Sequence, residues 1–221
     1  MCFSPEGDLA GGIVVTAIGV DAFRHLRRRE DHRMLAALPL LLGAHQIDET
    51  FVWWWLQGHS SAAVGRVAMW IYLLIAFVVL PVLLPLIVMG LEPTTRRRWA
   101  MAPFLAIGTG VSALLLETML RNGPRVTLGH YHLAYSIGLQ HGVAVIGLYI
   151  VATCGPLLAS GFRHIVLFGL ANLVAVLVLA RLSADGFASL WCFYAALATG
   201  GIMLHMRYAK PHRATPGAAA A

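Results

Sequence analysis

Hydrophobic residues gather along the chain in seven runs, separated by short polar segments. A bilayer core of about 30 Å is crossed by roughly 20 apolar residues of α-helix, and each run is near this length. The runs cover residues 9–26, 34–57, 67–91, 99–120, 133–159, 164–184 and 187–208. Pro81 and Pro85 lie inside the third run, where membrane helices tolerate proline as a kink. The pattern predicts an all-α polytopic membrane protein: one domain of seven transmembrane helices over residues 1–208, then a disordered cytoplasmic tail, 209–221.

Composition supports this class. Of 221 residues, 59% are hydrophobic and 12% are charged, whereas a soluble domain has about 45–50% and about 25%. A soluble fold has too few charges here to cover so much apolar surface. This excludes soluble globular, disordered and fibrous proteins.

Charge indicates orientation and not a nucleic-acid partner. The net charge of +6 comes from arginines clustered between the apolar runs, where basic residues act as topology signals. Alternate loops carry twelve Lys and Arg on one side and four on the other. The positive-inside rule places the N-terminus outside and the C-terminus in the cytoplasm of a multi-pass protein of the cell (inner) membrane.

Polar residues are concentrated in the second run, which contains GAHQIDETFVWWW. His45 and Glu49 are four residues apart and share one helix face, with Trp53 next along it. Ionisable groups inside a membrane are costly unless they face a cavity or a partner. The pair therefore indicates either a functional site or a hydrogen-bonded contact that fixes helix packing. The Trp53–Trp55 triplet is typical of an aromatic belt at the membrane surface.

Other segments deliver polar side chains to the same outer half. Glu117 and Arg121 are again four residues apart and form either a site or a surface ion pair. The remaining members are Cys2, His130, His132, His141 and Asp185. Imidazole and carboxylate groups that converge across helices suit Zn, Fe or Cu, and two histidines can hold a haem. We expect metal ligands among His45, Glu49, His132 and His141, with Cys2 and His130 as substitutes.

Three function classes fit this arrangement. The first is a metal- or haem-binding membrane protein, including a membrane-embedded metalloenzyme. In such an enzyme Glu49 or Glu117 would act as general acid/base, and Arg121 would hold an anionic substrate group. The alternatives are a proton-coupled transporter and an accessory subunit of a membrane complex. Expected partners are membrane lipid, a small lipophilic substrate, and copies of the chain or other membrane subunits. Retinal is excluded because Lys210, the single lysine, follows the last run and cannot form a Schiff base in mid-membrane.

Several motifs resemble an uncharacterised family of bacterial integral membrane proteins that begin Met-Cys-Phe-Ser and carry a domain-of-unknown-function label. These motifs are MCFSPEGDLAGG, LLGAHQIDETFVWW, LLIAFVVLPVLLPL, GHYHLAYSIG, LYIVATCGPLL and ADGFASLWCFYAA. The resemblance implies a shared membrane fold and no particular activity. The polar and aromatic residues of this sequence that lie in these motifs and are candidates for the site are Cys2, His45, Glu49, His130 and Trp191. Of these, His45 and Trp191 are candidates for cofactor binding.

Overall fold

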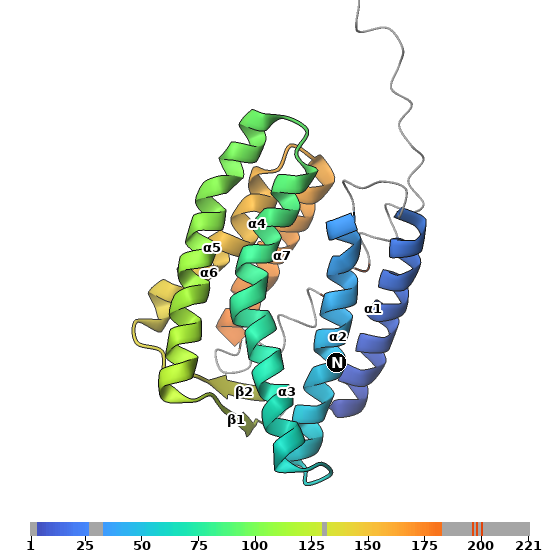
Figure 1. The fold of residues 1–221 in the computed structure, drawn as a ribbon, viewed down its shortest axis with the longest axis vertical. Helices are drawn as coiled ribbons and strands as arrows, with labels where there is room; N and C mark the ends of the chain where they lie inside the picture. Colours follow the sequence, from blue (N-terminus) through green and yellow to red (C-terminus); the bar gives the residue numbers. More distant parts are fainter. Residues whose placement is uncertain are drawn as a thin grey trace, which may run out of the picture.

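The computed structural model describes residues 4–26, 33–129 and 132–182, together with positions 196, 198 and 200. These residues form a mostly helical bundle with one small β-hairpin (Figure 1). The helices are α1 (Pro5–Leu26), α2 (Arg33–Leu56), α3 (Ala62–Leu74), the π-helical turn η2 (Ile75–Val79), α4 (Leu80–Leu91), α5 (Thr95–Asn122), α6 (Gly142–Ala159) and α7 (Arg163–Leu182). The strands are β1 (Arg125–Leu128) and β2 (Leu133–Ser136).

Chain turns gather at two opposite ends of the bundle, because α1, α2, the rod of α3, η2 and α4, and then α5, α6 and α7 run in alternating directions (Figure 1). One end, the hairpin end, holds the α2–α3 turn, the two strands and the start of α1. The other, the arginine end, holds the α4–α5 and α6–α7 turns, with Arg96–Arg98 and Arg163 in their first helical residues. The predicted grouping of loops into two sets is therefore matched by the packing of these helices.

Helix α1 begins at Pro5, four residues before the predicted run. The Ser4 hydroxyl oxygen accepts a hydrogen bond from the Gly7 backbone N–H at 3.2 Å, and Pro5 suits the first helical turn because its missing N–H is not needed there. Farther along, α1 packs closely on α2 at Gly12 and Gly43: a Cβ at Gly12 would lie 2.9 Å from the Gly43 carbonyl oxygen. Small residues at this contact let the two backbones approach.

The third run forms one continuous rod over residues 62–91, interrupted by the π-turn η2. In η2 the Leu80 N–H donates to the Ile75 carbonyl, five residues back. In the same register the Ala76 carbonyl would pair with residue 81, but Pro81 has no N–H. The Tyr149 hydroxyl of α6 donates to the Ala76 carbonyl instead, at 2.7 Å. A neighbouring helix thus satisfies the backbone group that proline leaves without a donor.

The predicted helix over 133–159 is wrong at its start. Residues 133–136 form β2, which pairs antiparallel with β1 in the register Arg125↔Ser136 to Leu128↔Leu133. The helix α6 begins at Gly142. It cannot begin earlier because Gly138 and His141 have φ values of 65° and 56°, which are left-handed conformations that end an α-helix. The fold is therefore helical with one hairpin, and not purely helical.

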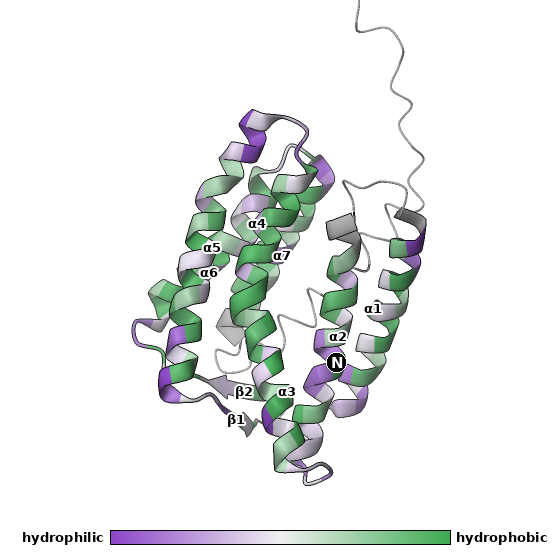
Figure 2. Ribbon diagram, in the orientation of Figure 1, coloured by the Kyte–Doolittle hydropathy of each residue, from purple (hydrophilic) through white to green (hydrophobic). Residues whose placement is uncertain are grey.

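Three helices in the described residues are long and apolar enough to cross a membrane: Ala62–Leu91, Thr95–Asn122 and Gly142–Ala159. Many large apolar side chains on the helix surfaces are exposed, Val67, Leu120 and Val143 among them, and Figure 2 shows hydrophobic residues along most of each helix. The seventh run, 187–208, lies outside the described residues apart from positions 196, 198 and 200, as do the predicted tail, Asp185 and Trp191.

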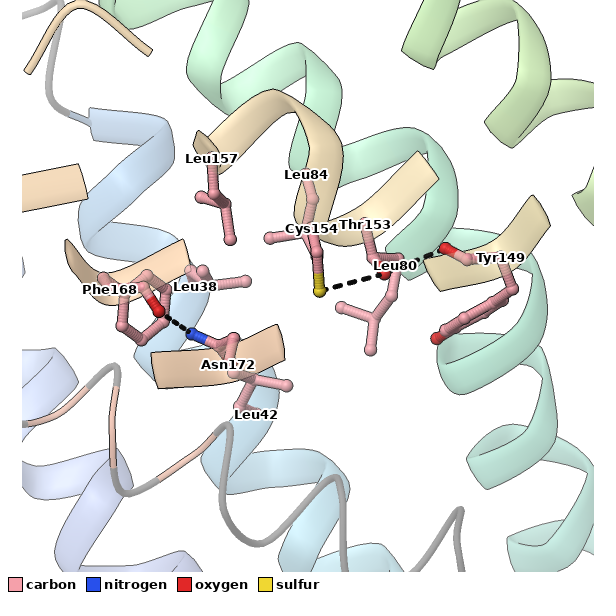
Figure 3. Close-up of a pocket in the computed structure, with 10 residues that line it drawn as sticks. All are labelled: Leu38, Leu42, Leu80, Leu84, Tyr149, Thr153, Cys154, Leu157, Phe168 and Asn172. Carbon is pink, nitrogen blue, oxygen red and sulfur yellow. Dashed lines mark hydrogen bonds between the residues drawn. The ribbon is translucent and has the colours of Figure 1, made fainter. Parts of the chain in front are cut away.

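The centre of the bundle contains a small cavity between α2, α4, α6 and α7 (Figure 3). Its volume is about 20 Å³, which is the space of about one water molecule and far below the roughly 300 Å³ of a ligand pocket. Two of its polar side chains bond along their own helices: Thr153 to the Tyr149 carbonyl at 2.9 Å and Asn172 to the Phe168 carbonyl at 2.8 Å. As lined by the described residues, this cavity is too small to hold a substrate.

Candidate functional site

The first turn of α1 and the C-terminal half of α2 hold a buried polar cluster at the hairpin end. Two pairs of polar residues, each four residues apart, lie on two adjacent faces of α2: His45 with Glu49, and Gln46 with Thr50. Their exposed fractions are 0–1%. Such burial of polar groups is costly unless each finds a hydrogen-bond partner, so the cluster requires partners from neighbouring elements.

Asp8 of α1 supplies the partner for one face. Its side chain has an exposed fraction of 0%. The Gln46 side-chain amide donates to Asp8 Oδ1 at 2.6 Å, and the Trp53 indole N–H donates to Asp8 Oδ2 at 2.8 Å. Both carboxylate oxygens are therefore held by donors from α2. Trp53 is buried for this reason, so the prediction that it belongs to an aromatic belt at the membrane surface is wrong.

Three stacked rings extend from the other face of α2. The His45 ring stacks on Tyr72 of α3 with centroids 4.1 Å apart and planes inclined by 16°. Tyr72 stacks in turn on Tyr135 of β2, at 4.7 Å and 12°. The Tyr135 hydroxyl donates to Glu49 Oε1 at 3.4 Å. This aromatic ladder joins α2, α3 and the hairpin, and it returns to α2 at the carboxylate one turn beyond His45.

The hairpin closes the cluster from the end of the bundle. Alternation along β2 places Leu133 and Tyr135 on the same face, and Leu133 is fully buried in the core. Ile137 follows them into the core. The Asn122 side chain at the end of α5 donates to the Ile137 and Gly138 carbonyls, each at 3.1 Å. The hairpin is thus part of the core and fixes the position of Tyr135 over Tyr72.

The cluster retains buried polar atoms that the structure does not pair. Within the described part of the chain, neither Thr50 Oγ1 nor Asp48 Oδ2 has a hydrogen-bond partner. A buried polar group without a partner costs about 1–3 kcal/mol. Such atoms are rare in folded proteins, so they support this cluster as the candidate site.

The other predicted site residues lie apart from this cluster. Glu117 and Arg121 form an ion pair of 2.6 Å at the end of α5, with side chains 60% and 76% exposed respectively. His141 is exposed at the N-cap of α6 and lines a surface pocket with that pair. The predicted run over 133–159 places His141 inside a helix. That placement is wrong because α6 begins at Gly142, after His141.

The described residues do not form the predicted metal centre. Among them, no three His, Cys, Asp or Glu side chains are close enough together to hold a metal ion. His45 and Glu49 are buried in the cluster, whereas His132 lies in the hairpin turn, where its carbonyl accepts the Gly129 N–H at 2.9 Å. The structure therefore does not bring His45, Glu49, His132 and His141 together as one group. Cys2 and His130 lie outside the described residues.

A family comparison accounts for almost the whole chain. The family of unknown function DUF6629 matches residues 1–219. The chain belongs to DUF6629. This confirms the predicted relationship to an uncharacterised family. No curated protein and no solved structure matches this DUF6629 chain.

Two buried carboxylates of the DUF6629 chain were missed from the sequence. Asp8 was left out because the first helix was expected to begin at residue 9; the signal was the Ser4-Pro5-Glu6 helix start, which places Asp8 inside the helix. Glu92 follows α4 at the arginine end, and its Oε1 accepts from Ser160 Oγ at 2.8 Å and from the Gly161 N–H at 2.7 Å. No sequence spacing connects Glu92 with the α6–α7 turn, so folding alone reveals that contact.

Proposed function

We propose that this chain is a seven-span membrane protein that moves protons through the polar cluster of α1 and α2. The carrying observation is that His45 and Glu49, both fully buried, are linked through Tyr72 and Tyr135 to the hairpin end. Ionisable side chains inside membrane bundles mark ion pathways and proton relays.

The membrane placement has two supports. Three described helices have the length and apolar character of spans, and large apolar side chains are exposed along the helices, as lipid contact requires. In the proposed topology α1, α2, α7 and residues 187–208 also cross the membrane. The arginine-rich turns lie at one end (Figure 1), so this end would face the cytoplasm and the hairpin end the outside.

Asp8 and Glu49 have different roles in this proposal. Asp8 is an anchor, because side-chain N–H groups of Gln46 and Trp53 hold both of its oxygens. Glu49 is the exchanging group, because it accepts from a phenol hydroxyl that can itself both donate and accept. Tyr135 belongs to a strand at the end of the bundle, so it would pass protons between Glu49 and the outer water. His45 would continue the path inward.

Proton flux in liposomes tests this proposal. The purified chain is reconstituted into vesicles that contain a pH-sensitive dye, and a pH gradient is imposed with valinomycin present to balance charge. We expect the chain to accelerate dye response over empty vesicles. Glu49→Gln removes the exchangeable proton while keeping the side-chain shape, so it should slow the flux about 10²-fold, as the loss of an acid–base group does.

Glu6→Gln provides the matched control, since Glu6 is an exposed carboxylate in the first turn of α1 at the same end. Glu6→Gln should keep the proton flux within about twofold of the wild-type value, because surface substitutions have small effects. Circular dichroism checks that both variants fold. A wild-type flux equal to that of empty vesicles overturns the proposal, and equal rates for wild type and Glu49→Gln remove Glu49 from the path.

A further inference from the structure

A surface pocket of about 410 Å³ lies at the hairpin end, between the last turns of α5 and the start of α6. This volume is within the range of roughly 300–1,000 Å³ typical of ligand sites. Its lining combines two charged side chains with polar and apolar ones. The lining includes Leu114, Glu117, Arg121, Asn122, Leu139 and His141.

The walls of the pocket are fixed by contacts within the chain. Asn122 donates to two carbonyls of the segment that leads to α6, at 3.1 Å each. His141 caps α6 in the left-handed conformation, with φ 56°, and its carbonyl accepts the N–H groups of Ala144 and Val145. The pocket is therefore formed without a ligand, which lowers the entropic cost of binding.

The pocket presents opposite charges side by side. Arg121 Nη2 contacts Glu117 Oε1 at 2.6 Å, and a guanidinium has five N–H donors. The remaining donors of Arg121 have no partner among the described residues, and both side chains are more than half exposed. A ligand that carries an anion and a cation close together can therefore bind Arg121 with one and Glu117 with the other. A phosphate suits the guanidinium especially well, through paired hydrogen bonds.

The surroundings indicate where such a ligand comes from. Leu114 forms an apolar part of the lining, and Leu120 and Val143, close to the pocket in sequence, are 68% and 89% exposed. Arg121 lies in the last turn of a helix long enough to span a membrane, and so at the level of lipid headgroups in the proposed placement. Apolar side chains on the membrane side would contact acyl chains.

We propose that this pocket binds the headgroup of a zwitterionic phospholipid of the phosphatidylethanolamine class. Arg121 binds the phosphate, Glu117 binds the ammonium, and Leu114 contacts an acyl chain. The inference depends on the membrane placement proposed above and is independent of proton movement.

Native mass spectrometry of the detergent-solubilised chain tests this site. Dioleoyl phosphatidylethanolamine and dioleoyl phosphatidylglycerol have the same acyl chains and a phosphate, but only the first has an ammonium. We expect the dissociation constant of the ethanolamine lipid to be about two- to fivefold lower, the range of one exposed charge pair. Glu117→Gln should abolish this preference. Arg121→Gln should raise the dissociation constants of both lipids by a similar factor, because both carry the phosphate that Arg121 binds.

Exposed groups of the same types provide the controls. Glu6→Gln and Arg125→Gln remove one charge each at the same end of the bundle and should preserve the preference. Equal affinity of the wild type for both lipids overturns the inference, as does a preference that survives Glu117→Gln. A failure of the membrane placement has a different signature, because the chain would then leave the membrane fraction in a carbonate wash without detergent.

Discussion

The hydrogen bond from Tyr149 to the Ala76 carbonyl allows a quantitative test of how the chain accommodates proline. Tyr149→Phe removes the hydroxyl and keeps the ring, which packs edge-on against Phe77 with centroids 6.5 Å apart. The Ala76 carbonyl then loses its donor: the Leu80 N–H is used by Ile75, and Pro81 has none.

The expected loss in free energy of unfolding is about 1–2 kcal/mol. Side-chain hydrogen bonds in membrane proteins contribute about 0.6 kcal/mol on average and up to about 1.7 kcal/mol. This bond is at the strong end because it is short, at 2.7 Å, and because its loss leaves a buried carbonyl without a partner, which costs about 1–3 kcal/mol. Since the ring is retained, no cavity contributes to the change.

Reversible unfolding by SDS in mixed micelles, followed by tryptophan fluorescence, measures this change. The decisive comparison is a double-mutant cycle with Pro81→Ala, which restores an N–H that can donate within the rod. In the Pro81→Ala background, Tyr149→Phe should lower the free energy of unfolding by less than about 0.5 kcal/mol. The interaction energy between the two substitutions is then about 1 kcal/mol, within the range for residues in direct contact. An equal cost in both backgrounds would refute the reasoning, and so would a cost below about 0.3 kcal/mol in the native background.

Two further contacts give predictions in the same assay. Glu92→Ala should destabilise the chain by about 2–3 kcal/mol, because it removes the charged acceptor of both Ser160 and Gly161, whereas Ser160→Ala should cost about 1 kcal/mol; equal losses would contradict this contact. Gly43→Val should cost about 1–3 kcal/mol, because any Cβ there collides with Thr16 and the α1 backbone. A neutral effect would show that α1 and α2 pack less closely than described.

The sequence predicted the helices better than the site, for identifiable reasons. Apolar runs mark spans of helix directly, and α2, α4, α5 and α7 end within a few residues of the predicted bounds. The run from 133 failed because alternating β2 residues such as Leu133 and Tyr135 are also apolar enough to extend a helical run. Only Gly138 and the left-handed His141 separate strand from helix, and a histidine in that conformation has no sequence signature.

The candidate site was predicted in part. His45 and Glu49 were selected because ionisable residues inside an apolar run are conspicuous, and both are buried in the cluster. Their partners were not selected. Tyr72 lies in an apolar run where a tyrosine carries no particular signal, and its position between His45 and Tyr135 depends on how α3 and the hairpin pack. Long-range contacts of this kind require the fold, since the residues are separated by 27 and 63 positions.

The pairing of α1 with α2 also bears on how the chain is made. Asp8 emerges from the ribosome long before Gln46 and Trp53, the residues that hold its carboxylate. In the proposed topology both helices cross the membrane. If the chain entered the membrane one helix at a time, α1 alone would expose the Asp8 carboxylate to lipid and α2 alone would expose its row of polar groups, each at a considerable energetic cost. Packed together at Gly12 and Gly43, the two helices would hide these groups from lipid in that topology. The first two helices are therefore expected to leave the translocation machinery together, as one preassembled insertion unit.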